Sequence, residues 1–145
     1  MEALIHIDQE CVKKQVANIL KDFPQVAGAY LFGSCLEGCR PDSDIDIGLV
    51  LEDINISDRE KAQLVASINN LFYPLDGHVY DIVLLELNNP IFCFKVIKEG
   101  RLIYIKTAER IADVMEIVSR HYADLYPRYR RALQEIIEEV IADGC

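Results

Sequence analysis

Basic residues are scarce in this sequence. The 145 residues include 15 Lys and Arg against 24 Asp and Glu, which gives a formal net charge of −9. DNA and RNA are bound mainly through clustered Lys and Arg, so the composition disfavours a nucleic acid as the partner. An acidic protein can still bind a single nucleotide through a metal ion, or dock a basic protein on an acidic face.

Long apolar runs and an ordered set of cysteines are also missing. No segment approaches the roughly 18 apolar residues of a membrane helix, and the N-terminus lacks the basic start and apolar stretch of a signal peptide. The five cysteines are odd in number, and Cys35 and Cys39 lack the second pair of ligands that a zinc site needs. We therefore expect a cytoplasmic protein with reduced thiols and no membrane contact.

Two common phosphate-binding signatures are absent as well. The sequence contains neither GxxxxGK[ST] nor GxGxxG, so it predicts neither a P-loop nor a Rossmann dinucleotide site. Hydrophobic residues make up 51% of the chain, which is enough for the core of one ordinary domain. Apolar periodicity predicts helices at 8–22, 57–72 and 90–99, strands at 28–32, 44–51, 78–85 and 101–105, and only helices from residue 107 onward.

These elements predict an α/β (α+β) fold. We expect a small mixed β-sheet flanked by helices in residues 1–106, followed by a helical extension in residues 107–145 that packs on it or on a partner. Asp8 and Ser57 are expected helix N-caps, and Asp76–Gly77 is expected to form a turn. If the fold leaves the last apolar stripe exposed, that stripe becomes an interface for a partner or a second copy in a homo-oligomer. The stripe consists of Leu133, Ile136, Ile137, Val140 and Ile141.

Two carboxylates stand two residues apart in the second predicted strand. Side chains alternate along a strand, so Asp44 and Asp46 project from one face while Ile45 and Ile47 point to the other. Two like charges on one face repel each other unless a cation lies between them. Mg²⁺ is the natural candidate, because it prefers oxygen ligands and is often held by one or two carboxylates plus substrate phosphates.

A third acid lies inside the strongly apolar strand His78–Leu85. An unpaired carboxylate is costly in such a strand, so Asp81 is the best candidate to join Asp44 and Asp46, provided that the two strands are neighbours. Three carboxylates could then hold two metal ions, and Asp81 could also accept the proton of an attacking hydroxyl. We interpret His78, which has no visible partner in the sequence, as a surface or strand-end residue.

A Gly-Ser turn follows the first predicted strand. Gly33 would let the backbone approach a phosphate closely, and the Ser34 hydroxyl could donate to its oxygens. Arg40 could add a cation to this nucleotide-binding loop. Ser43 could orient a metal-binding carboxylate beside the nucleotide, although a simple turn or strand-start residue is the commoner role.

These residues carry a family resemblance. Phe32-Gly33-Ser34, then nine residues, then Asp44-Ile45-Asp46 resembles the signature of the polymerase-β-like nucleotidyltransferases, and residues 40–46 look like their minimal nucleotidyltransferase branch. The resemblance implies the nucleotidyltransferase fold, ATP as substrate and Mg²⁺ as cofactor. It implies that Asp44, Asp46 and Asp81 bind the metal ions and that the Gly-Ser turn binds the triphosphate.

The same resemblance suggests a partner. Many minimal members are similar to antitoxins that pair with a helical HEPN toxin, and some transfer AMP from ATP to a tyrosine of that toxin. The first hypothesis is therefore a Mg²⁺-dependent nucleotidyltransferase that modifies a HEPN-type partner. Cys35 and Glu37 replace polar or basic residues of the family pattern, which keeps open a non-catalytic antitoxin with a vestigial nucleotide site. A third hypothesis, an enzyme that modifies a small hydroxylated drug as aminoglycoside nucleotidyltransferases do, usually needs a larger acceptor domain.

Overall fold

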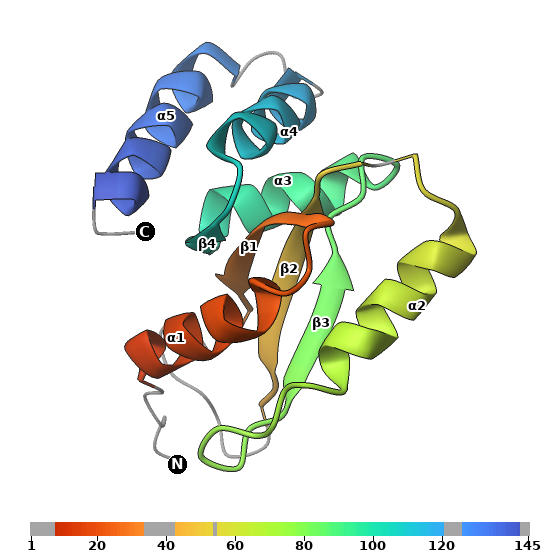
Figure 1. Cartoon of the computed structure of the whole chain (residues 1–145). Helices are drawn as coiled ribbons and strands as arrows, with labels where there is room; N and C mark the ends of the chain where they lie inside the picture. Colours follow the sequence, from red (N-terminus) through yellow and green to blue (C-terminus); the bar gives the residue numbers. More distant parts are fainter. Residues whose placement is uncertain (1–7, 34–42, 54, 121–125, 143–145) are drawn as a thin grey trace.

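A four-stranded mixed sheet forms the centre of the molecule. The computed structural model describes residues 8–33, 43–53, 55–120 and 126–142 (Figure 1). The strand order is β3-β2-β1-β4, where β1 is antiparallel to β2 and β4, and β2 is parallel to β3. The strands are β1 (Val26–Phe32), β2 (Ile45–Leu51), β3 (Tyr80–Leu84) and β4 (Arg101–Ile105). The predicted mixed sheet is therefore confirmed.

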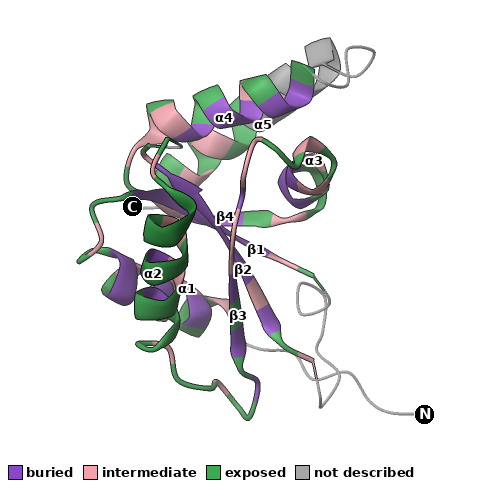
Figure 2. Cartoon of the chain, turned by 90° about the vertical axis from the view of Figure 1, so that its right-hand side faces the viewer, coloured by how far each residue is buried: buried purple, intermediate pink, exposed green. Residues whose placement is uncertain are grey.

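Helices cover both faces of this sheet. They are α1 (Gln9–Leu20), α2 (Asp58–Asn69), α3 (Pro90–Glu99), α4 (Ala108–Arg120) and α5 (Tyr126–Ala142). One half of the core joins α1 and α2 to the sheet, and the other half joins α3 and α4 to the opposite face. In Figure 2 the strands are mostly buried, while α2 turns an exposed side to solvent. The fold is thus an α+β arrangement with the sheet between two helical layers.

Local sequence signals explain where the first two helices begin. The Asp8 carboxylate accepts hydrogen bonds from the backbone N–H groups of Glu10 at 3.0 Å and Cys11 at 3.4 Å. The Ser57 hydroxyl accepts one from the backbone N–H of Glu60 at 3.1 Å. Each side chain thus satisfies N–H groups that lack a partner within their own helix. Both predicted N-caps are confirmed.

The third strand begins two residues later than the sequence predicts. Leu75 and His78 exchange two backbone hydrogen bonds of 2.9 Å each, and they close a tight turn around Asp76 and Gly77. Both central residues have positive φ angles, 52° and 83°, as the two-residue turns of type I′ require. The predicted turn at Asp76–Gly77 is confirmed, but its closure takes His78 out of the strand, which starts at Tyr80.

The C-terminal helices build on the face that α3 covers. Helix α4 buries one side against the sheet, while α5 lies against α4 with Ile137 and Val140 half-buried (Figure 1). Ile136 and Ile141 of α5 are exposed, so its apolar stripe is only partly covered. Within the described residues, no helix has the length and apolar character to cross a membrane.

Candidate active site

The pairing of β2 with β3 brings two of the predicted acids together. The strands run parallel, and Asp46 is the direct register partner of Asp81. Register partners of neighbouring strands point to the same face, so the two carboxylates lie side by side. Asp44 lies just before β2, two residues from Asp46, and is exposed like Asp81. The three acids therefore gather at the starting ends of two adjacent strands.

The surroundings of Asp46 raise its affinity for protons. The pKa of Asp46 rises to about 6, first because the side chain is partly buried and then because the charges of Asp81 and Asp44 are close. Among the described residues, neither Asp46 nor Asp81 is part of an ion pair. A cation bound between these carboxylates would remove much of this repulsion.

Gly33 packs directly against one of these acids. A Cβ atom at this position would lie 2.1 Å from Oδ2 of Asp46 and 3.1 Å from its Cγ. Gly33 also has a φ angle of +83°, which other residues rarely adopt. Any side chain here would displace the carboxylate. The glycine of the predicted turn is thus required by its acidic neighbour, in addition to the nucleotide-binding role expected from the sequence.

The other nucleotide-binding candidates divide into two groups. Ser34 and Arg40 lie outside the described residues. Ser43 is half-buried, and its carbonyl oxygen lies 2.8 Å from Nδ1 of the His78 ring. Of the two interpretations of His78, the surface position is wrong, because its side chain is only 2% exposed, whereas the residue does lie close to the end of a strand, two residues before β3. The predicted Asp-Gly turn places this residue in front of the strand that carries Asp81, but it gives no signal that the side chain is buried.

Comparison with known protein families matches residues 14–109 to the family described as polymerase beta, nucleotidyltransferase. The chain belongs to this family. The match includes Gly33, the three acids and the whole sheet. The acids at the starting ends of β2 and β3 thus lie within the part of the chain that matches the family.

Solved structures resemble this nucleotidyltransferase over most of its length. A chain from the complex of a tri-AMPylated Shewanella oneidensis HEPN toxin with its MNT antitoxin has a TM-score of 0.57 and 19% identity, over 90% of this chain and 99% of that one. A chain from a toxin–antitoxin structure with AMP-PNP has a TM-score of 0.56 and 21% identity, over 89% and 98%. These likenesses confirm the fold. No curated protein matches the sequence.

The donor set of this nucleotidyltransferase suits a hard divalent cation. All three candidate ligands are carboxylates, which favour Mg²⁺ or Mn²⁺ over the softer metals that His and Cys bind. Among the described residues, no three His, Cys, Asp or Glu side chains are gathered tightly enough to form a complete metal site. Mg²⁺ in nucleotide enzymes commonly takes only one or two protein carboxylates and completes its shell with phosphates and water. The raised pKa of Asp46 and its pairing with Asp81 fit such an incomplete site.

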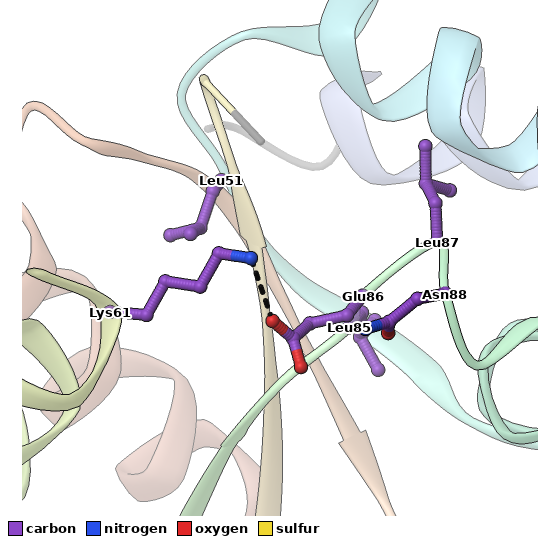
Figure 3. Close-up of a pocket in the computed structure, with 6 residues that line it drawn as sticks. All are labelled: Leu51, Lys61, Leu85, Glu86, Leu87 and Asn88. Atoms are coloured by element: carbon purple, nitrogen blue, oxygen red, sulfur yellow. Dashed lines mark ion pairs between the residues drawn. The ribbon is translucent and has the colours of Figure 1, made fainter. Parts of the chain in front are cut away.

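A hollow lies at the opposite end of the same strands. It has a volume of about 210 Å³ and is lined by Leu51, Lys61 and residues 85–88. Figure 3 shows the Lys61 ammonium reaching the Glu86 carboxylate at 2.9 Å. Leu51 ends β2 and Leu85 follows β3, so this hollow is separated from the nucleotidyltransferase acids by the length of the strands. Its one acid is already paired with a cation, which distinguishes it from the acids of the site.

Proposed function

We propose that this chain transfers AMP from ATP to a hydroxyl group in a Mg²⁺-dependent reaction, and that the acceptor is a tyrosine of a HEPN-type toxin. The observation that carries the proposal is the pairing of Asp46 with Asp81 in a member of the nucleotidyltransferase family. Gly33, pressed against Asp46, supports it, because the glycine of the turn and the acids then form one site.

The proposed reaction needs few chemical groups from the protein. The acceptor oxygen forms a bond to the α-phosphorus of ATP, the bond from that phosphorus to the pyrophosphate oxygen breaks, and pyrophosphate leaves. Asp81, exposed at the start of β3, would accept the proton of the attacking hydroxyl. Asp44 and Asp46, with Asp81 as third ligand, would hold two Mg²⁺ ions. Bound there, the ions would neutralise charge on the attacking and leaving oxygens.

In the proposed complex, ATP contacts both the acids and the turn that follows β1. Gly33 precedes Ser34, and we propose that Ser34, Arg40 and Ser43 contact the triphosphate while the carboxylates bind it through the metal ions. Most of the contribution of the protein is then positioning and charge neutralisation. AMP-PNP, an analogue of ATP, is present in one of the similar toxin–antitoxin structures, which supports ATP as the nucleotide.

The proposed partner follows from the structural relatives. One of them contains a HEPN toxin that carries three AMP groups, and another is an MntA–HepT complex in which two aspartates, two positions apart, are changed to glutamate. Asp44 and Asp46 have the same spacing in this chain. We propose that the chain neutralises its toxin by AMP transfer in the cytoplasm, where ATP and Mg²⁺ are available.

Intact-mass measurement tests the proposal. The purified chain is incubated with ATP, Mg²⁺ and the product of a neighbouring gene that encodes a helical protein. We expect one or more AMP groups on the partner, and none when EDTA is added. If neither the partner nor small hydroxyl compounds gain AMP, the catalytic proposal fails. Neutralisation of the toxin without added AMP would then favour the non-catalytic antitoxin.

A further inference from the structure

We propose that His78 is a positioning residue for the carboxylates. Its ring ties the segment in front of β2 to the segment in front of β3, and so holds Asp44 and Asp46 beside Asp81. This inference rests on the proposed function of the same three acids. The positioning itself has a structural readout that does not depend on AMP transfer.

The turn holds the backbone of His78 in place independently of the contact that its ring makes. The reciprocal 2.9 Å hydrogen bonds with Leu75 close the turn around Asp76 and Gly77, whose positive φ angles restrict the chain to one sharp reversal. The side chain then enters the interior and is 2% exposed. The ring therefore starts from a defined backbone position and has little room to move.

The contact between His78 and Ser43 has only one chemical interpretation. A carbonyl oxygen accepts hydrogen bonds and cannot donate them, so Nδ1 of the ring must carry the proton that lies between it and the Ser43 oxygen, 2.8 Å away. Because the ring is buried, loss of this partner would leave a desolvated N–H group without a hydrogen bond, which is unfavourable. The contact is thus strongly favoured in the folded chain.

A second bond follows directly after the first. The backbone N–H of Ile45 donates to the carbonyl oxygen of Val79 at 2.8 Å. Ser43 is therefore bonded to His78 and Ile45 to Val79, and Asp44 lies between Ser43 and Ile45 in the chain. Asp44 precedes the first residue of β2, so these two bonds hold the backbone on both sides of it.

The location of β3 explains why such a tie matters. This strand is at the edge of the sheet and pairs with β2 alone, and its ladder begins at Tyr80 opposite Ile45. The His78–Ser43 bond lies just ahead of that first rung. Without it, the Ile45–Val79 hydrogen bond becomes the outermost bond between the starting ends of the two strands, and it would open more often, which would loosen the placement of the acids.

Two substitutions, His78→Leu and His78→Asn, test the role of the ring. Asn and Leu have nearly the same shape, but only the Asn amide can place a donor near the position of Nδ1. For His78→Leu we expect kcat for AMP transfer to fall about 10- to 100-fold, as for other groups that orient metal ligands. The Mg²⁺ concentration for half-maximal rate should rise, while KM for ATP changes less than about threefold. His78→Asn should keep most of the activity.

Hydrogen exchange measures the positioning without any acceptor. The Ile45 amide should exchange about tenfold faster or more in His78→Leu than in the wild-type chain, and at nearly the wild-type rate in His78→Asn. Tyr80→Phe is the matched control, because it removes a neighbouring buried hydroxyl that has no hydrogen-bond partner among the described residues. This control should leave both the exchange rate and the Mg²⁺ requirement unchanged.

The ring itself can be observed in the unaltered protein. The ¹⁵N spectrum should show that Nδ1 of His78 carries a proton, so this readout survives even if His78→Leu does not fold. A ring with a proton on Nε2 and none on Nδ1 would overturn the proposal. Equal Ile45 exchange in His78→Leu and wild type would overturn it too, as would equal losses in the Asn and Leu variants. A wild-type chain that transfers no AMP but shows the predicted exchange would refute the function and leave the positioning intact.

Discussion

The acidic side chains at the two ends of β2 and β3 have opposite electrostatic surroundings. At the carboxyl ends, Glu86 pairs with Lys61 at 2.9 Å, and Glu52 accepts a hydrogen bond from the Thr107 hydroxyl. At the starting ends, Asp46 lies between the charges of Asp81 and Asp44, and its pKa rises to about 6. At the carboxyl ends, these acidic side chains have partners within the chain. At the starting ends, carboxylates that repel each other lie close together, as expected where a ligand completes the site.

The sharpest test of this difference removes a charge from the crowded end. Asp46→Asn preserves the size of the side chain but removes a proposed metal ligand, so AMP transfer should fall by more than about 100-fold. Intact-mass measurement of the partner gives the rate, and circular dichroism checks that the fold is retained. Transfer at the wild-type rate would remove Asp46 from the site.

The next test uses the two glycines that share a φ angle of +83°. Gly33→Ala places a Cβ atom 2.1 Å from the Asp46 carboxylate, whereas Gly77→Ala meets nothing within 4 Å. Both changes introduce backbone strain of about 1–2 kcal/mol, but only Gly33→Ala adds the steric clash. Thermal denaturation should therefore show a larger loss of stability for Gly33→Ala, and AMP transfer should also be lost. Equal losses of stability would show that the contact with Asp46 is unimportant.

The pH dependence of stability gives a smaller effect of known sign. The folded-state pKa of Asp46 is about 6, above the ordinary aspartate value of 3.8, so folding favours the protonated form. That contribution is complete below about pH 4 and is lost as the pH rises through 6. At pH 8 without metal, Asp46→Asn should be more stable than wild type by about 1 kcal/mol, since solvent screens the partly exposed group.

The measurement compares melting temperatures of the two proteins at pH 5 and pH 8 in EDTA. The advantage of Asp46→Asn should shrink toward pH 5, where the wild-type carboxyl is mostly protonated. Added Mg²⁺ should raise the melting temperature of the wild type more than that of the variant. An advantage that stays constant with pH would mean that the repulsion at this end of the sheet is negligible.

The smallest effect is expected at the paired end. Lys61→Met removes the ion pair with Glu86 but keeps most of the apolar stem of the side chain. Ion pairs that solvent still reaches, as it reaches this one, contribute little, so the free energy of unfolding should change by less than about 1 kcal/mol. AMP transfer should be unchanged. A large loss of activity would show that the two ends of the sheet are coupled.

Local sequence patterns predicted much of this site. Alternation along one strand was sufficient to place Asp44 and Asp46 on one face, and the cost of a charge in an apolar strand pointed to Asp81. Whether the two strands were neighbours could not be read from either strand alone, because parallel pairing depends on the topology of the whole sheet. The structure supplies that pairing and shows Asp46 opposite Asp81.

His78 was missed for a related reason. Its partner is a backbone carbonyl 35 residues earlier, and such groups carry no signature of their own in the sequence. The turn at Asp76–Gly77 was predicted, but the sequence did not show that its closure would send the following side chain into the interior. The contact between Gly33 and Asp46 was likewise invisible, because residue spacing does not report close approach between strands.

The contact between Gly33 and Asp46 also constrains how this protein can evolve. A Cβ at position 33 would lie 2.1 Å from the Asp46 carboxylate and would force it to shift, so under the proposed mechanism the two positions should not change independently. A lineage that abandons catalysis and replaces the acid with a smaller residue removes the steric barrier to alanine at position 33. Descendants that keep the fold but not the chemistry should therefore show paired changes at these two sites.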